Sequence, residues 1–315
     1  MATVGGSRRP RIACVQLDSK HADVEANARQ VEALTSRFEP GELDMVVLPE
    51  MALTGYVFGS AQEIQRLIER PFDSPPQSPS LQLAAKLATR LRSYVIIGLP
   101  FYGSEMRSGA LSSPFDARPA EAKAKESVSP GRGPYNGALL VDPNGHVIHA
   151  FRKHFLFETD ETWARQGPGF ELIHVPRLGK ICVAICMDLN PWNFEAEESK
   201  CELATFCKEA DVDGLIVTMA WLRSRAAAAD DDHGLSVINY WAMRLRPLLS
   251  VGIPMPESAA QSASRPRFFI AANRSGTEQG LAFAGSSCAL QIDSEQRPIL
   301  IGRLRETEGV LVAEI

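Results

Sequence analysis

Short apolar segments rich in β-branched residues alternate along this chain with longer segments whose apolar positions recur at helical spacing. Segments of the first kind predict strands, and those of the second kind predict amphipathic helices. Their alternation predicts an α/β layered fold. The predicted strands are 11–17, 44–48, 94–99, 138–141, 147–151, 180–186, 214–219, 268–272, 287–292, 298–302 and 309–313. The predicted helices are 22–37, 60–69, 80–92, 202–209 and 235–248.

One hairpin and two irregular regions complete this pattern. The turn residues Asp142-Pro143-Asn144-Gly145 stand between two apolar segments and predict an antiparallel pair, so the sheet containing it is mixed. Stretches near 103–134 and, on either side of the predicted helix 235–248, within 223–266 are rich in polar residues, Pro, Ala or Ser and have no clear period. We interpret them as loop insertions. With no internal repeat and no clear linker, residues 1–315 are predicted to form a single domain.

Composition restricts the classes of partner. The chain has 315 residues, of which 45% are hydrophobic, so it can bury a substantial core. A net charge of −5 makes nucleic acid and anionic membrane surfaces unfavourable partners. No apolar stretch approaches the roughly 20 residues that a membrane span requires. Six scattered cysteines without an export signal indicate reduced thiols and a cytoplasmic location.

Three residues of complementary chemistry follow predicted strands. Cys186 ends the strand 180–186 at a turn, where a thiol is supported yet accessible to a substrate, and the N–H of Met187 could stabilise an oxyanion. Glu50 follows the strand 44–48, and partial desolvation there would raise its pKa into the range of a general base. Lys153 follows the strand 147–151 and could neutralise a developing oxyanion. Taken singly, each has an ordinary structural explanation, such as a buried small side chain or a surface charge.

Together these segments resemble the nitrilase superfamily of carbon–nitrogen hydrolases, which use a Glu–Lys–Cys triad. The resemblance assigns catalysis to Glu50, Lys153 and Cys186. It implies an α/β four-layer α-β-β-α sandwich of the nitrilase type with two mixed sheets, and neither a cofactor nor a metal. The matching segments, in order, are Leu48-Pro49-Glu50, Thr54-Gly55-Tyr56, Gly98-Leu99-Pro100, Tyr135-Asn136, Phe151-Arg152-Lys153, Cys186-Met187-Asp188, Met219-Ala220-Trp221 and Ala272-Asn273-Arg274-Ser275-Gly276.

The segment from Cys186 to Ala196 further resembles the fungal-type protein N-terminal asparagine and glutamine amidases. That branch implies deamidation of N-terminal Asn and Gln to Asp and Glu, with ammonia released through a thioester on the cysteine. The partner would be a protein or peptide with a free N-terminus. Assembly as a monomer or a homodimer, the preference between Asn and Gln, and a link to protein degradation stay open.

Supporting residues also follow from the resemblance. Glu161, eight positions beyond Lys153, is expected to orient that lysine. The α-ammonium group of the substrate calls for an acidic partner, and the acidic residues near the triad in sequence are Asp160, Asp188 and Glu195. Trp192 and Trp221 are expected to line the pocket. Capping or core-packing roles are alternatives for each of these five.

Other functions fit parts of the sequence. Another nitrilase-family amidase, or an N-carbamoyl hydrolase acting on a small free amide, would use the same triad. A Cys–His hydrolase is disfavoured because the six histidines form no recognisable partner motif. A zinc protein is disfavoured because Cys201 and Cys207 lack the close spacing of structural zinc ligands. A catalytically inactive scaffold is disfavoured because all three triad residues are present.

Overall fold

The computed structural model describes residues 8–103, 111–112, 133–194, 200–224, 234–249, 266–293 and 297–315. Two mixed sheets contain most of the strands. The first sheet has the order β15 (Gly309–Glu314), β1 (Arg11–Gln16), β2 (Met45–Val47), β3 (Tyr94–Tyr102), β5 (Pro134–Val141) and β6 (Val147–Arg152). The second has the order β14 (Pro298–Arg303), β13 (Cys288–Ile292), β10 (Arg267–Ala272), β9 (Gly214–Thr218), β8 (Gly179–Ile185), β7 (Glu171–Val175) and β4 (Leu111–Ser112).

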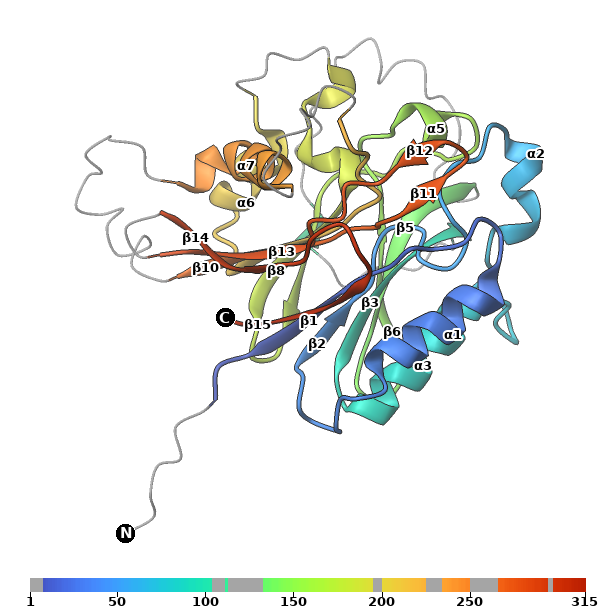
Figure 1. Cartoon of the computed structure of the whole chain (residues 1–315), viewed down its shortest axis with the longest axis horizontal. Helices are drawn as coiled ribbons and strands as arrows, with labels where there is room; N and C mark the ends of the chain where they lie inside the picture. Colours follow the sequence, from blue (N-terminus) through green and yellow to red (C-terminus); the bar gives the residue numbers. More distant parts are fainter. Residues whose placement is uncertain are drawn as a thin grey trace.

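Helices lie on the outer side of each sheet. Figure 1 shows α1 (Val24–Thr35) and α3 (Pro79–Leu91) on one side of the molecule and α6 (Glu202–Glu209) and α7 (Leu235–Arg244) on the other. The remaining elements are short: α2 (Ala61–Ile64), α5 (Glu158–Glu161), the two-stranded sheet of β11 (Thr277–Glu278) and β12 (Leu281–Ala282), and 3-10 turns at Gln65–Leu67, Cys186–Leu189, Trp192–Phe194 and Arg246–Leu248.

Alternation along the strands of the first sheet creates the layers. On β1, Ile12 and Cys14 point into the core between the sheets, whereas Ala13 and Val15 pack with Leu87 and its neighbours under the helices. A strand places successive side chains on opposite faces, so a strand covered on both faces reads as continuously apolar. The same division holds for β2 and β3. The predicted four-layer sandwich is confirmed.

Most predicted elements are present, with differences of one to three residues at many ends. The hairpin is confirmed, because β5 and β6 pair antiparallel. The strand β7 was missed, since its sequence Glu-Leu-Ile-His-Val is short and carries two polar side chains. The predicted helix 60–69 is instead α2 followed by a 3-10 turn. Of the predicted insertions near 103–134 and 223–266, residues 104–110, 113–132, 225–233 and 250–265 lie outside the described residues, whereas α7 and the 3-10 turn after it lie within the second.

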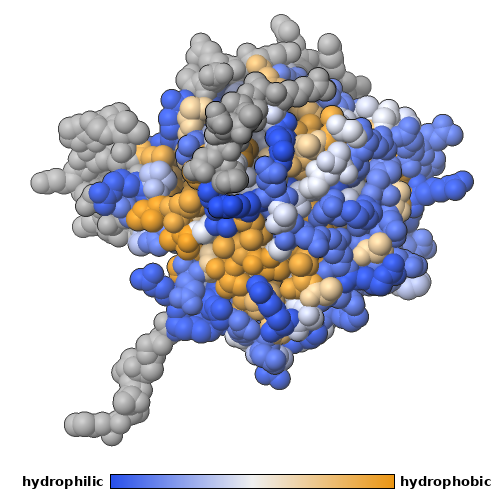
Figure 2. Space-filling view, viewed as in Figure 1, coloured by the Kyte–Doolittle hydropathy of each residue, from blue (hydrophilic) through white to orange (hydrophobic). Residues whose placement is uncertain are grey.

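One face of the molecule carries an apolar area next to a hydrophilic surface. Large exposed apolar side chains gather on β14, at Ile299, Leu300 and Ile301. Figure 2 shows an apolar area over β14 and β15, next to a mainly hydrophilic surface over α1 and α3. Within the described part of the chain, no helix combines the length and apolar character needed to cross a bilayer.

Candidate active site

Cys186 occupies the point where β8 ends and the chain turns. It is the first residue of the 3-10 turn Cys186–Leu189, with a left-handed φ of 42°. A non-glycine residue with a left-handed backbone conformation marks a sharp turn that the surrounding structure holds in place. Turns of this kind present a nucleophile at the end of a strand. Because the first N–H groups of a helical turn lack partners within it, the N–H of Met187 can serve an oxyanion.

Glu50 and Lys153 meet in the fully buried space beside this turn. Lys153 donates from Nζ to Glu50 Oε1 at 2.6 Å, and both side chains are 0% exposed. Asn136 Nδ2 donates to the same oxygen at 2.7 Å. The other oxygen, Oε2, accepts the backbone N–H of Ala220 at 2.8 Å. Glu50 is therefore held by partners from three separate segments of the chain.

The second carboxylate at Lys153 belongs to Asp160. Lys153 Nζ lies 2.6 Å from Asp160 Oδ2, and Asn136 Nδ2 donates to Asp160 Oδ1 at 2.8 Å. Asp160 also accepts the N–H of Phe157 at the start of α5, which turns its side chain inward. Glu161 is exposed. The expectation that Glu161 orients the lysine is thus corrected to Asp160, because the short helix points its third residue toward Lys153 and its fourth toward solvent.

The buried ion pair of Glu278 and Arg274 supports the site through Tyr56, which contacts Asp160. Tyr56 donates from its hydroxyl to Asp160 Oδ2 at 3.3 Å, and Lys153 Nζ lies 5.5 Å from the centre of its ring. Glu278 accepts the backbone N–H groups of Tyr56 and Val57, and it pairs with Arg274 at 2.7 Å. This pairing fixes the segment that carries Tyr56 against the segment that carries Arg274.

Burial sets the charges of the central groups. Burial raises the pKa of Glu50 above its ordinary value, although the charge of Lys153 opposes the shift. Burial and then the charge of Glu50 raise the pKa of Cys186 well above its ordinary value. For Lys153, burial alone would lower the pKa, but the carboxylates of Asp160 and Glu50 outweigh it and raise the pKa well above the ordinary value. The resting site thus holds a protonated thiol, a charged lysine and a carboxylate able to accept a proton.

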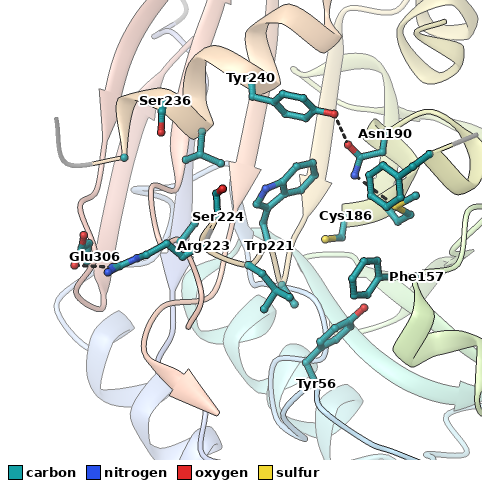
Figure 3. A pocket seen from close by; sticks show the side chains of 17 residues that line it. Tyr56, Phe157, Cys186, Asn190, Trp221, Arg223, Ser224, Ser236, Tyr240 and Glu306 are labelled. Atoms are coloured by element: carbon teal, nitrogen blue, oxygen red, sulfur yellow. Dashed lines mark hydrogen bonds and ion pairs between the residues drawn. The ribbon is translucent and has the colours of Figure 1, made fainter. Parts of the chain in front are cut away.

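Cys186 opens into a cavity of about 630 Å³. That volume falls in the range of small-molecule sites and could admit one terminal residue with part of the chain behind it. Figure 3 shows Cys186 among aromatic side chains, with the Arg223–Glu306 ion pair at the far end. The described residues lining the cavity are Tyr56, Phe157, Cys186, Met187, Asn190, Phe194, Ala220, Trp221, Leu222, Arg223, Ser224, Gly234, Ser236, Val237, Tyr240, Ala284 and Glu306.

The predicted substrate-binding residues lie in different surroundings. Trp221 lines the cavity, as predicted, whereas Trp192 is absent from the cavity lining and packs against the large buried core cluster, with its backbone N–H directed to Glu202 of α6. Asp188 is buried and accepts the N–H groups of His154, Phe155 and Ile185, so it ties the lysine loop to the cysteine loop. Asp160 is occupied by Lys153. Glu195 lies outside the described residues.

Several residues of the site had no assigned role in the sequence. Asn136, Tyr56 and Ala220 touch the buried charges, and each lies in a segment that carries the family resemblance. Asn273 accepts the N–H of Trp221 at 2.7 Å and so fixes that indole-bearing residue at the cavity wall. The resemblance was therefore the available signal, because none of these residue types is distinctive by itself.

Comparison with known proteins places the chain in a family. The model of the carbon–nitrogen hydrolase family matches residues 11–191. The protein N-terminal amidase of Schizosaccharomyces pombe is 30% identical over 321 residues, which cover 97% of this chain and 99% of that protein. The protein N-terminal amidase of Saccharomyces cerevisiae is 28% identical over 199 residues, covering 58% of this chain and 37% of that protein.

Solved structures show the same fold. A crystal structure of an N-terminal amidase with an Asn-Glu-Ala peptide superposes with a TM-score of 0.74 at 20% identity, covering 98% of each chain. A crystal structure of N-terminal amidase with a Gln-Val peptide superposes with a TM-score of 0.73 at 19% identity, over 98% of each chain. With the family model matching more than half of its length, this chain belongs to the carbon–nitrogen hydrolase family.

Proposed function

We propose that this protein is an amidase that converts N-terminal Asn and Gln of proteins or peptides into Asp and Glu, with release of ammonia. The observation that carries the proposal is the buried contact of Lys153 Nζ with Glu50 Oε1 at 2.6 Å, beside Cys186, which itself lines the cavity. The near full-length similarity to an S. pombe protein named as an N-terminal amidase supports the choice of substrate.

The first half of the reaction acylates Cys186. Glu50 takes the thiol proton as Sγ attacks the side-chain carboxamide carbon. The oxyanion that forms is held by Lys153 and by the backbone N–H of Met187. Lys153 has three N–H groups, and with one directed to Glu50 and one to Asp160, the third is available for this task. Glu50 then gives its proton to the departing ammonia, and a thioester remains.

The second half restores the enzyme. Glu50 accepts a proton from a water molecule, whose oxygen attacks the thioester carbon. The carbon–sulfur bond breaks, the product leaves as a carboxylic acid, and the Cys186 thiol regains its proton. All six cysteines are free and buried, so a reducing compartment such as the cytosol would suit this chemistry.

A panel of peptides tests the substrate assignment. Peptides that begin with Asn, Gln, Val or acetyl-Asn are compared for ammonia release and for the product mass. We expect turnover of the Asn and Gln peptides and none of the Val or acetyl-Asn peptides. Turnover of acetyl-Asn without turnover of free Asn would replace the proposal with an amidase that acts on blocked or small amides.

A further inference from the structure

The α-ammonium group of the substrate needs a place close to Cys186. In an N-terminal Asn only the Cβ separates the reacting carboxamide carbon from Cα, and Gln adds a single methylene. The ammonium must therefore fall on the cavity wall beside the thiol rather than at the far end of the cavity. This inference rests on the proposed function and specifies how its substrate is selected.

The described carboxylates near this place are already engaged or distant. Glu50 and Asp160 both bind Lys153. Asp188 accepts hydrogen bonds from three backbone N–H groups. Glu306 pairs with Arg223 at 2.7 Å, and Figure 3 places that pair at the end of the cavity away from Cys186.

A polar pair beside Cys186 offers neutral oxygens instead. Tyr240 donates from its hydroxyl to Asn190 Oδ1 at 2.7 Å, and both residues line the cavity. The Nδ2 of Asn190 lies 3.4 Å from Met187 Sδ, which fixes the amide with its oxygen toward Tyr240. An amide oxygen has two acceptor sites, and a phenolic hydroxyl can accept a hydrogen bond while it donates one, so the pair can accept hydrogen bonds from a cation while keeping its own bond.

An aromatic wall adjoins this pair. The ring centroids of Trp221 and Tyr240 are 5.7 Å apart, and Figure 3 shows Trp221 beside Cys186. Its backbone is fixed on both sides, since its N–H reaches Asn273 and its carbonyl accepts the N–H of Ala284. The face of an indole attracts an ammonium group.

We propose that Asn190, Tyr240 and Trp221 form an uncharged binding site, here called the neutral seat, for the α-ammonium group of the N-terminal residue. Such an uncharged site has a physical advantage over a carboxylate at this position. Another negative charge beside Cys186 would raise the thiol pKa further and would oppose the oxyanion. Oxygen dipoles and an aromatic face bind the cation without that effect.

The test compares each peptide with its desamino analogue. The probes are an Asn-starting peptide and the same peptide whose first residue has hydrogen in place of the α-amino group. Wild-type protein should prefer the free amine. Tyr240→Phe should lower kcat/KM about tenfold on the free amine, the scale of one lost hydrogen bond to a charged group, and leave the desamino value unchanged. Tyr102→Phe, a tyrosine on β3 that packs against Arg70, serves as the matched control and should change neither value.

A second variant covers the case in which loss of the hydroxyl disturbs folding. Asn190→Asp should raise the preference for the free amine over the desamino peptide, because it adds a charge at the seat, even if both rates fall. Equal losses on both peptides in Tyr240→Phe, or a preference lost in Glu195→Gln and retained in Tyr240→Phe, would overturn the seat. Turnover of neither Asn nor Gln peptides by the wild type would instead overturn the proposed function itself.

Discussion

Lys153 donates to Asp160 at 2.6 Å, the same length as its bond to Glu50. The ammonium group is thus shared between two buried carboxylates, one that can carry a proton and one that fixes the lysine. Asn136 donates to both carboxylates and links them into one network. Two negative charges around one positive charge are stable in a buried site only with such additional donors.

The first prediction concerns this pairing. Asp160→Asn should lower kcat about 100-fold, because the lysine loses the partner that orients it toward the oxyanion. The acid limb of the pH profile should also move to lower pH, since the charge of Asp160 raises the pKa of Glu50. Steady-state kinetics across pH measure both effects.

Glu161→Gln is the matched control for that variant. It changes the adjacent carboxylate, which is exposed, and should leave the kinetics unchanged. Loss of activity in Glu161→Gln with normal activity in Asp160→Asn would restore Glu161 as the orienting residue.

The strand-end positions of Glu50, Lys153 and Cys186 could be predicted from the sequence, because apolar strands with a chemically active residue after them are visible in the pattern itself. The choice among Glu158, Asp160 and Glu161 could not. All three fall in one short helix, and the way α5 begins at Phe157 decides which carboxylate turns inward. The role of Asn136 could not be derived from its residue type, since the register of β5 against β6 brings it to Lys153; only the family resemblance of its segment marked it.

The second prediction concerns pH. Glu50 must be ionised to accept the thiol proton, and burial raises its pKa above the ordinary 4.5. Activity should therefore fall as the pH is lowered through a midpoint above 4.5. Lys153 should remain charged throughout, because its pKa is raised well above 10.5. A kcat/KM profile that shows no fall as the pH is lowered from neutral to 4.5 would argue against Glu50 as the base.

The third prediction concerns Asp188. Its two oxygens accept three backbone N–H groups from the loops that carry Lys153 and Cys186. Asp188→Asn should replace one acceptor with a donor and lower the free energy of unfolding by about 2 kcal/mol. Thermal or denaturant unfolding measures this.

The exposed carboxylate Glu158 provides the control for that stability measurement, because Glu158→Gln removes no buried acceptor and should unfold as the wild type does. An Asp188→Asn protein of unchanged stability that binds Asn peptides poorly would return Asp188 to the substrate-binding group.

The fourth prediction concerns the covalent intermediate. A thioester on Cys186 is open to nucleophiles other than water. Turnover of an Asn peptide in the presence of hydroxylamine should yield the side-chain hydroxamate together with the acid. Mass analysis distinguishes the two products. Release of ammonia with no hydroxamate, at hydroxylamine concentrations that leave the protein folded and active, would favour direct attack by water.

The most direct test of the account is ammonia release from an Asn-starting peptide by the wild type and by Cys186→Ala, followed side by side with the mass of the peptide. The account predicts one ammonia for each Asp-starting product with the wild type and only background with the variant. Equal rates for the two proteins would contradict it, as would a folded wild type that leaves both Asn- and Gln-starting peptides intact.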